Sequence, residues 1–158
     1  IMFRDVTTLF GHAEGLRETI SQFVELFKDQ NIDAVAGLEA RGFIIGGAVA
    51  ERLGVGFVPI RKAGKLPGKT LSEDYTLEYA TATVEIHDDA LAAGQKVLLI
   101  DDLIATGGTA AAGIKLIERL GAEVIHTAFI IDLPALGGAD IIRKLGVPVT
   151  ALCAFDGE

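Results

Sequence analysis

Hydrophobic residues occur along the chain in short runs, separated by longer stretches with a helical period. The runs fall at 33–38, 56–60, 97–100, 123–132 and 148–152. Their length, and the glycine or charged residues that bound them, are typical of strands. A run as apolar as 97–100 indicates a strand buried on both faces of a sheet, which is the pattern of parallel sheets.

The segments between these runs show the spacing of amphipathic helices. Over 14–30, apolar side chains at Leu16, Ile20, Phe23 and Phe27 follow the i, i+3, i+4, i+7 pattern. Further helices are predicted over 43–53, 110–120 and 135–144, with a short helical turn over 87–91. The alternation of strand and helix predicts an α/β fold, with a parallel central sheet flanked by helices on both faces.

One region departs from this alternation. Residues 62–75 are polar and contain glycines, and 72–75 are turn-like, a composition typical of a mobile hood that closes over a ligand. Residues 81–86 alternate apolar and polar positions, which predicts an antiparallel strand or hairpin arm. Ligand-binding loops are expected at the carboxyl ends of the parallel strands.

Length and composition restrict the class of protein. The 158 residues fit a single domain over 1–158, and the first residue, Ile1, suggests that an N-terminal segment is missing from the sequence. No apolar run approaches the roughly 20 residues of a membrane span, and no secretory signal is recognisable. The single cysteine, Cys153, has no partner for an internal disulfide. A cytoplasmic protein without membrane contact is expected.

The net charge of −8 argues against a nucleic-acid partner. Any anionic ligand must therefore be held by local cations. Four of these, Arg61, Lys62, Lys65 and Lys69, fall within nine positions. The ligand site is expected near this cluster.

The stretch 97–112 carries the strongest chemical signal. After the apolar run come Asp101 and Asp102, and then Ala105-Thr106-Gly107-Gly108-Thr109 before a predicted helix. A loop of small residues at a helix N-terminus is suited to bind a phosphate, and carboxylates accept hydrogen bonds from sugar hydroxyls. The alternative is a tight turn whose glycines serve packing and whose acids are solvated.

A second strand ends in Glu39-Ala40-Arg41-Gly42. Arg41 can offer two parallel N–H donors to a phosphate, and Gly42 allows close approach of the backbone. The alternative is an ordinary surface arginine in a loop between strand and helix.

Several other chemistries are excluded. The segment 64–70 reads G-x-x-x-G-K-T, one residue short of the ATPase phosphate loop, and polar residues follow it in place of a helix. The sequence has no cysteine and histidine cluster for zinc and no G-x-S-x-G nucleophile motif.

The stretch V-L-L-I-D-D-L-I-A-T-G-G-T resembles the phosphoribosyl-pyrophosphate signature of the type I phosphoribosyltransferases. Four further stretches, F-R-D, L-E-A-R-G-F, R-K-A-G-K-L-P-G and Y-T-L-E-Y-A, resemble the adenine-specific branch. The resemblance implies the type I phosphoribosyltransferase fold and transfer of a phosphoribosyl group to adenine, giving AMP and pyrophosphate. It also implies a homodimer, and Mg²⁺ held mainly by substrate and water in place of protein ligands.

The resemblance also implies roles for single residues. Glu78 would manage the proton on the purine, Tyr79 would shield or orient the reacting groups, and Asp101 and Asp102 would favour an oxocarbenium-like ribose. Adenine would lie against Phe3, Arg4 and Leu103. Phosphoribosyl pyrophosphate would be bound by Arg41, Arg61, Lys62, Lys65, Asp101, Asp102, Ala105, Thr106, Gly107, Gly108 and Thr109. Members of this branch often have a non-proline cis peptide in the L-E-A-R-G-F loop.

Three alternatives stay open at this point. Without the resemblance, Glu78 reads as a solvated strand acid. Enzymes for hypoxanthine and guanine usually have aspartate where this chain has Ala105, but xanthine enzymes can have alanine there, so another 6-oxopurine or orotate is possible as substrate. A regulator that kept the pocket without catalysis would normally need a DNA-binding element, and no basic helix is present.

Overall fold

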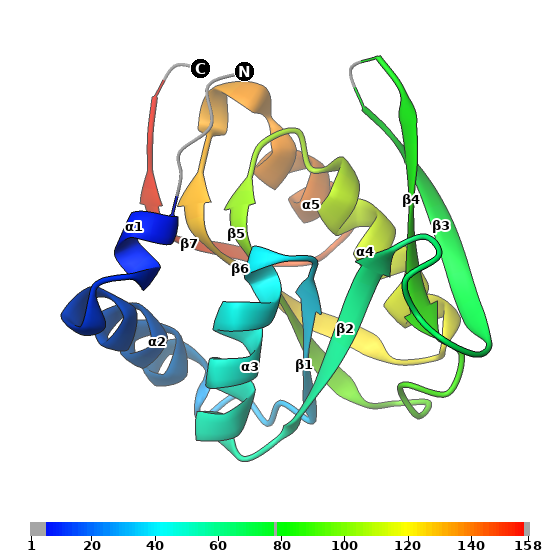
Figure 1. Ribbon diagram of the computed structural model, residues 1–158, viewed down its shortest axis with the longest axis horizontal. Helices are drawn as coiled ribbons and strands as arrows, with labels where there is room; N and C mark the ends of the chain where they lie inside the picture. Colours follow the sequence, from blue (N-terminus) through cyan, green and yellow to red (C-terminus); the bar gives the residue numbers. More distant parts are fainter. Residues whose placement is uncertain (1–5, 78, 157–158) are drawn as a thin grey trace.

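The computed structural model describes residues 6–77 and 79–156, which build a seven-stranded sheet in the order β3-β4-β2-β1-β5-β6-β7 (Figure 1). The strands are β1 Ala34–Leu38, β2 Gly56–Lys62, β3 Thr70–Thr76, β4 Thr81–His87, β5 Lys96–Ile104, β6 Glu123–Asp132 and β7 Val149–Ala154. The helices are α1 Thr7–Phe10, α2 Ala13–Phe27, α3 Arg41–Leu53, α4 Gly108–Arg119 and α5 Gly138–Lys144, with a 3-10 turn at Pro134–Leu136.

The central strands β2, β1, β5, β6 and β7 run parallel. Every residue of β1 is buried, as are Val97 to Ile100 of β5. These runs therefore lie in the middle of the sheet, where both faces are covered by helices. The α/β prediction with a parallel central sheet is confirmed.

The helices pack in two layers with a hydrophobic core under each. Helices α2 and α3 cover one face through a core that includes Phe23, Ile45 and Ile100. Helix α4 covers the other face, where Leu99 and Ile114 are fully buried. No helix in the described part of the chain is both long and apolar enough to cross a membrane.

The helix boundaries differ from the prediction by a few residues. Helix α2 ends three residues early at Phe27, and α3 begins at Arg41, two residues before the predicted start. The predicted helix over 135–144 is divided by Gly137, whose φ of 78° is left-handed, into the 3-10 turn and α5.

One prediction about the hairpin region is wrong, and a second is only partly confirmed. Residues 72–75 are not a turn but belong to β3, which pairs with β4 along its whole length from Thr70↔His87 to Thr76↔Thr81. The predicted helical turn over 87–91 is confirmed only in part: His87 is the last residue of β4, and one turn follows it, closed by a hydrogen bond from Ala90 N to the His87 oxygen at 3.2 Å. At 72–75 cross-strand pairing, with Leu71 and Tyr75 packed on the core, outweighs the local polarity of the sequence.

The expected antiparallel arm over 81–86 is present as β4, and β3 and β4 together form a hairpin at one edge of the sheet (Figure 1). Helix α4 holds the base of this hairpin. Arg119 Nη1 donates to the backbone oxygen of Ser72 at 2.7 Å and pairs with Glu73 at 3.0 Å. The hairpin is therefore connected to the helix that follows the glycine-rich loop.

Candidate functional site

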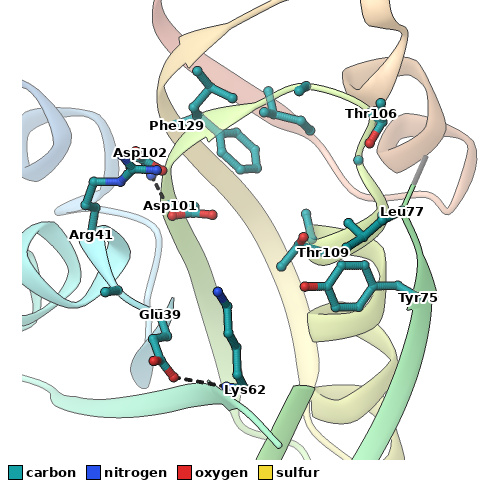
Figure 2. Close-up of a pocket in the computed structure, with 17 residues that line it drawn as sticks. Glu39, Arg41, Lys62, Tyr75, Leu77, Asp101, Asp102, Thr106, Thr109 and Phe129 are labelled. Carbon is teal, nitrogen blue, oxygen red and sulfur yellow. Dashed lines mark hydrogen bonds and ion pairs between the residues drawn. The ribbon is translucent and has the colours of Figure 1, made fainter. Parts of the chain in front are cut away.

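A pocket of about 310 Å³ opens at the carboxyl ends of β1, β2 and β5, facing the hairpin (Figure 2). Residues from five parts of the chain meet there. The first part is Glu39, Ala40 and Arg41; the second is Lys62; the third is Tyr75 and Leu77; the fourth is the continuous stretch 101–110; and the fifth is Phe129. The topology thus brings together the two stretches that the sequence assigned to anion binding, with one lysine of the cation cluster.

The glycine-rich loop leads directly into α4. Gly107 is the N-cap residue, with a left-handed φ of 87°, and no side chain among the described residues caps this helix. A helix N-terminus without a capping side chain presents unpaired N–H groups and the positive end of the helix dipole. The first turn of α4 can therefore receive an anionic group in the pocket.

The shape of this loop depends on a second glycine that the sequence analysis missed. Gly138 N donates to the carbonyl oxygen of Ala105 at 3.0 Å. A Cβ atom at Gly138 would overlap that oxygen, and a Cβ at Gly107 would lie 2.9 Å from the Gly138 carbonyl oxygen. The loop and the start of α5 thus pack backbone against backbone, across a sequence separation that no local motif reveals.

The two aspartates lie on β5, which continues through them to Ile104 and does not end at Ile100 as predicted. Because side chains alternate along a strand, the two carboxylates point in different directions. Figure 2 shows Asp101 pointing into the pocket and Asp102 pointing toward Arg41. Burial raises the pKa of Asp101 well above its usual value, and the adjacent charge of Asp102 raises it further.

Asp102 has only 6% of its side chain exposed and forms an ion pair with Arg41, with Oδ2 and Nε 2.8 Å apart. The pair is not aligned as a hydrogen bond, so this buried oxygen has no hydrogen-bond donor among the described residues. A buried acceptor without a donor is costly in a folded protein. The Arg41 charge offsets part of this cost, and Asp101 is the carboxylate that faces a ligand hydroxyl in the pocket.

Arg41 is the first residue of α3 and keeps 43% of its side chain exposed, so it remains accessible to an anion. The peptide bond between Glu39 and Ala40 is cis, as the resemblance implied. Gly42 allows α3 to approach β5, because a Cβ there would lie 2.9 Å from the backbone oxygen of Ile100 and 3.1 Å from Asp101 Oδ1.

Glu39 binds two of the four residues of the cation cluster, Arg61 and Lys65, by their side chains. Its carboxylate accepts from Arg61 Nε at 3.1 Å, from the backbone N of Lys62 at 3.0 Å, and from Lys65 Nζ at 2.6 Å. Arg61 also lies over the ring of Phe43, 5.7 Å from its centroid. Arg61 and Lys65 are therefore outside the pocket lining as the structure describes it, whereas Lys62 lines the pocket.

Burial alone would raise the pKa of Glu39, but hydrogen bonds from Lys65, Arg61 and the Lys62 backbone lower it from 4.5 to about 2. A carboxylate with a lowered pKa stabilises the fold fully above its usual pKa, and this contribution is lost as the pH falls from about 4.5 toward 2.

Glu39→Gln is therefore expected to lower the free energy of unfolding by about 1–2 kcal/mol near pH 7, after allowance for solvent screening of the exposed cations. The difference from the parent chain should shrink as the pH falls below about 4.5. Urea unfolding of both chains at a series of pH values measures it. A difference that stays constant down to about pH 3 would contradict the assigned pKa.

The remaining residues named from the sequence are placed as follows. Leu103, Thr106 and Thr109 line the pocket. Tyr79 is 92% exposed and does not contribute to the described lining. Phe3, Arg4 and Glu78 lie outside the described residues.

Three further residues line the pocket without a role predicted from the sequence: Tyr75, Leu77 and Phe129. Tyr75 packs close to the first residue of α4, since a Cβ at Gly108 would lie 3.5 Å from its ring. Tyr75 is the first residue of the Y-T-L-E-Y-A stretch, and this position could have indicated that it belongs to the site. Phe129 lies in a uniformly apolar part of β6, and nothing in that run distinguishes it from core residues.

Comparison with known proteins identifies the family of this chain. The family model described as phosphoribosyl transferase domain matches residues 6–150. The adenine phosphoribosyltransferases of Ruegeria pomeroyi and Dinoroseobacter shibae are 64% and 65% identical, over 99% and 100% of this chain and 88% of each relative.

Solved structures give the same result. The crystal structure of adenine phosphoribosyltransferase from Rhodothermus marinus is 50% identical with a TM-score of 0.90, covering 98% of this chain and 88% of that one. The Trypanosoma brucei enzyme in complex with AMP, pyrophosphate and ribose-5-phosphate is 34% identical with a TM-score of 0.89, covering 96% and 69%. The chain therefore belongs to the phosphoribosyltransferase family, within its adenine phosphoribosyltransferase branch.

Proposed function

We propose that this protein is a purine-salvage enzyme that transfers the 5-phosphoribosyl group of phosphoribosyl pyrophosphate to adenine, giving AMP and pyrophosphate. One observation carries the proposal: the uncapped start of α4 and the two aspartates of β5 line the same pocket. A phosphate next to sugar hydroxyls satisfies both groups at once. The ligands of the Trypanosoma brucei structure have these parts.

The geometry supports a division of the pocket into three parts. The 5-phosphate would bind the loop from Ala105 to Thr109, and the ribose hydroxyls would bind Asp101 and Asp102. As the bond to pyrophosphate breaks, positive charge develops on the ribose ring, and the two carboxylates would stabilise it. Arg41 and Lys62 would bind the departing pyrophosphate.

The base would be held and activated by residues from the N-terminal stretch and the hairpin. Leu103 lines the pocket and would contact adenine, together with Phe3 and Arg4. Glu78 would act as the general acid or base for the proton on the purine. Tyr79 would cover the reacting groups after the exposed hairpin closes.

Mg²⁺ would enter this site bound to the substrate. The described residues contain no group of three or more histidine, cysteine or acidic side chains that could hold a metal ion. The ion would therefore be bound mainly by phosphate oxygens, ribose hydroxyls and water, the ligands that Mg²⁺ prefers. When bound, it would neutralise charge on the leaving pyrophosphate.

A single-domain, cytoplasmic homodimer without nucleic-acid or membrane partners completes the proposal. The net charge of −8 supports the absence of a nucleic-acid partner, and the lone Cys153 is in keeping with a reducing compartment. Ile44, half exposed on α3, offers an apolar contact to a second copy of the chain.

An assay with five bases tests the reaction. With phosphoribosyl pyrophosphate and Mg²⁺, we expect rapid conversion of adenine. Turnover of hypoxanthine and guanine should be low because Ala105 provides no acid for them, and turnover of xanthine and orotate should be low because the relatives of this chain are adenine phosphoribosyltransferases. Absorbance changes of each base follow the reaction. Preferred turnover of an oxopurine would contradict the assignment to adenine, and binding without any turnover would favour a regulator.

A further inference from the structure

We propose that Glu39 is a positioning residue for the pyrophosphate half of the pocket. It fixes Lys62 so that the Lys62 ammonium enters the pocket, and it holds Arg61 and Lys65 outside. The inference rests on the proposed function, because it takes the pocket at Arg41 and Lys62 as the pyrophosphate site. It also replaces the prediction that Arg61 and Lys65 bind phosphoribosyl pyrophosphate directly, as Lys62 does.

The backbone of β2 shows why a hydrogen-bond acceptor is needed at this position. Strand β1 pairs with β2 only as far as Leu38↔Ile60, so the N–H of Lys62 projects past the end of its neighbour. Glu39 follows Leu38 directly, its own N–H donates to the Ile60 oxygen at 3.0 Å, and its Oε1 accepts the Lys62 N–H at 3.0 Å. The side chain thus continues the ladder by one residue beyond β1.

The alternation of β2 then fixes which cation faces the ligand. Arg61 and Lys62 are neighbours on a strand and point to opposite faces. Arg61 lies toward Phe43 and Glu39, while Figure 2 shows the Lys62 side chain extended into the pocket. A rotation that exchanged the two side chains would break the bond from the Lys62 backbone to Oε1, together with the pairing of Arg61 and Lys62 with β4.

Lys65 is retained by the second oxygen of the same carboxylate. Its Nζ lies 2.6 Å from Glu39 Oε2, and only 8% of the Glu39 side chain is exposed. The buried carboxylate therefore neutralises the cations on either side of Lys62 in the sequence. Lys62 and Arg41 remain as the cationic side chains that line the described pocket.

The test compares four single variants by steady-state kinetics with each substrate varied in turn. Glu39→Gln keeps the size of the side chain and removes its charge; Lys62→Met and Lys65→Met remove one ammonium each. Lys69→Met is the matched control, since it lies in the same loop and outside the described pocket lining. Circular dichroism and thermal melting establish that each variant is folded.

We expect Glu39→Gln and Lys62→Met each to raise KM for phosphoribosyl pyrophosphate about tenfold or more. Lys62→Met removes a charge-assisted bond to the ligand, and Glu39→Gln weakens the charge-assisted bond that holds the Lys62 backbone. KM for adenine should stay unchanged. Lys65→Met and Lys69→Met should remain within about twofold of the parent chain, because neither side chain lines the described pocket. The double variant Glu39→Gln/Lys62→Met should be no worse than Lys62→Met alone, because Glu39 acts through Lys62.

Each opposite result has a distinct meaning. Additive effects in the double variant, or equal changes in both KM values, would overturn the positioning role of Glu39. A tenfold effect of Lys65→Met would restore direct binding by Lys65 and also overturn it. Normal kinetics of Lys62→Met would remove the pyrophosphate site itself, and with it this inference, while adenine turnover would still support the proposed reaction.

If Glu39→Gln fails to fold, Glu39→Asp provides the same test. It retains the charge but has a shorter reach, so the bond to the Lys62 backbone should weaken. A rise in KM for phosphoribosyl pyrophosphate with unchanged KM for adenine would support the inference. Unchanged values for both substrates would overturn it.

Discussion

Replacing Asp102 with alanine is expected to lower kcat for AMP formation by about 100- to 1,000-fold, the usual cost of removing one electrostatic contact to a developing charge. The fold should persist, because Arg41, which loses its partner, is exposed enough to be solvated by water. Initial-rate kinetics give kcat, and near-ultraviolet circular dichroism together with a urea titration establish that the variant is folded.

The neighbouring strand supplies a control for this substitution. Asp132 on β6 pairs in register with Ile104, is partly buried with a pKa raised by burial, and lies outside the described pocket lining. Asp132→Asn removes a carboxylate charge from the same edge of the sheet and should leave kcat within about twofold, as expected for a charge that does not contact the reacting atoms. Near-normal activity of Asp102→Ala would refute the ribose-binding role.

Gly107→Ala is expected to raise KM for phosphoribosyl pyrophosphate by about 30-fold or more. A left-handed residue with a Cβ costs about 1–2 kcal/mol, and the new atom would also lie 2.9 Å from the Gly138 carbonyl oxygen. The loop must then shift relative to α5, and the N–H groups at the start of α4 lose their alignment. Inhibition by AMP, which carries the same 5-phosphate, should weaken in parallel.

Gly94→Ala separates the two contributions. Gly94 has a nearly equal φ of 84°, but a Cβ there would meet no atom within 4 Å, and the turn lies outside the described pocket lining. We expect it to lose about 1 kcal/mol of stability from backbone strain with unchanged KM. If Gly107→Ala matched Gly94→Ala in both respects, contact with Gly138 would have no part in phosphate binding.

The sequence was sufficient for the parallel sheet because its strands are apolar runs with few competing interpretations. It was not sufficient for the ends of those strands. Asp101 and Asp102 look like a stop signal, yet β5 continues through them because β6 offers pairing partners as far as Asp132. Residues 72–75 are likewise polar and therefore look like a turn. They form a strand because they pair with β4.

The site was predictable to a similar degree. The glycine-rich loop and the two acids are local in sequence, so the pattern alone placed them together, and the structure brings Arg41 and Lys62 to them. The sequence could not tell which cations of the cluster face the ligand. That depends on Glu39, which is 22 and 26 residues away from Arg61 and Lys65.

The backbone contact between Ala105 and Gly138 has a consequence for the thermodynamics of binding. The turn at the start of α4 is held in its receptive shape by a neighbouring element and not by a ligand, so it is preorganised. Ordering a loop of this kind on association would cost conformational entropy for every residue immobilised, about 1–2 kcal/mol each. Here that cost is met during folding, and the attraction between the helix end and the incoming phosphate remains available as affinity.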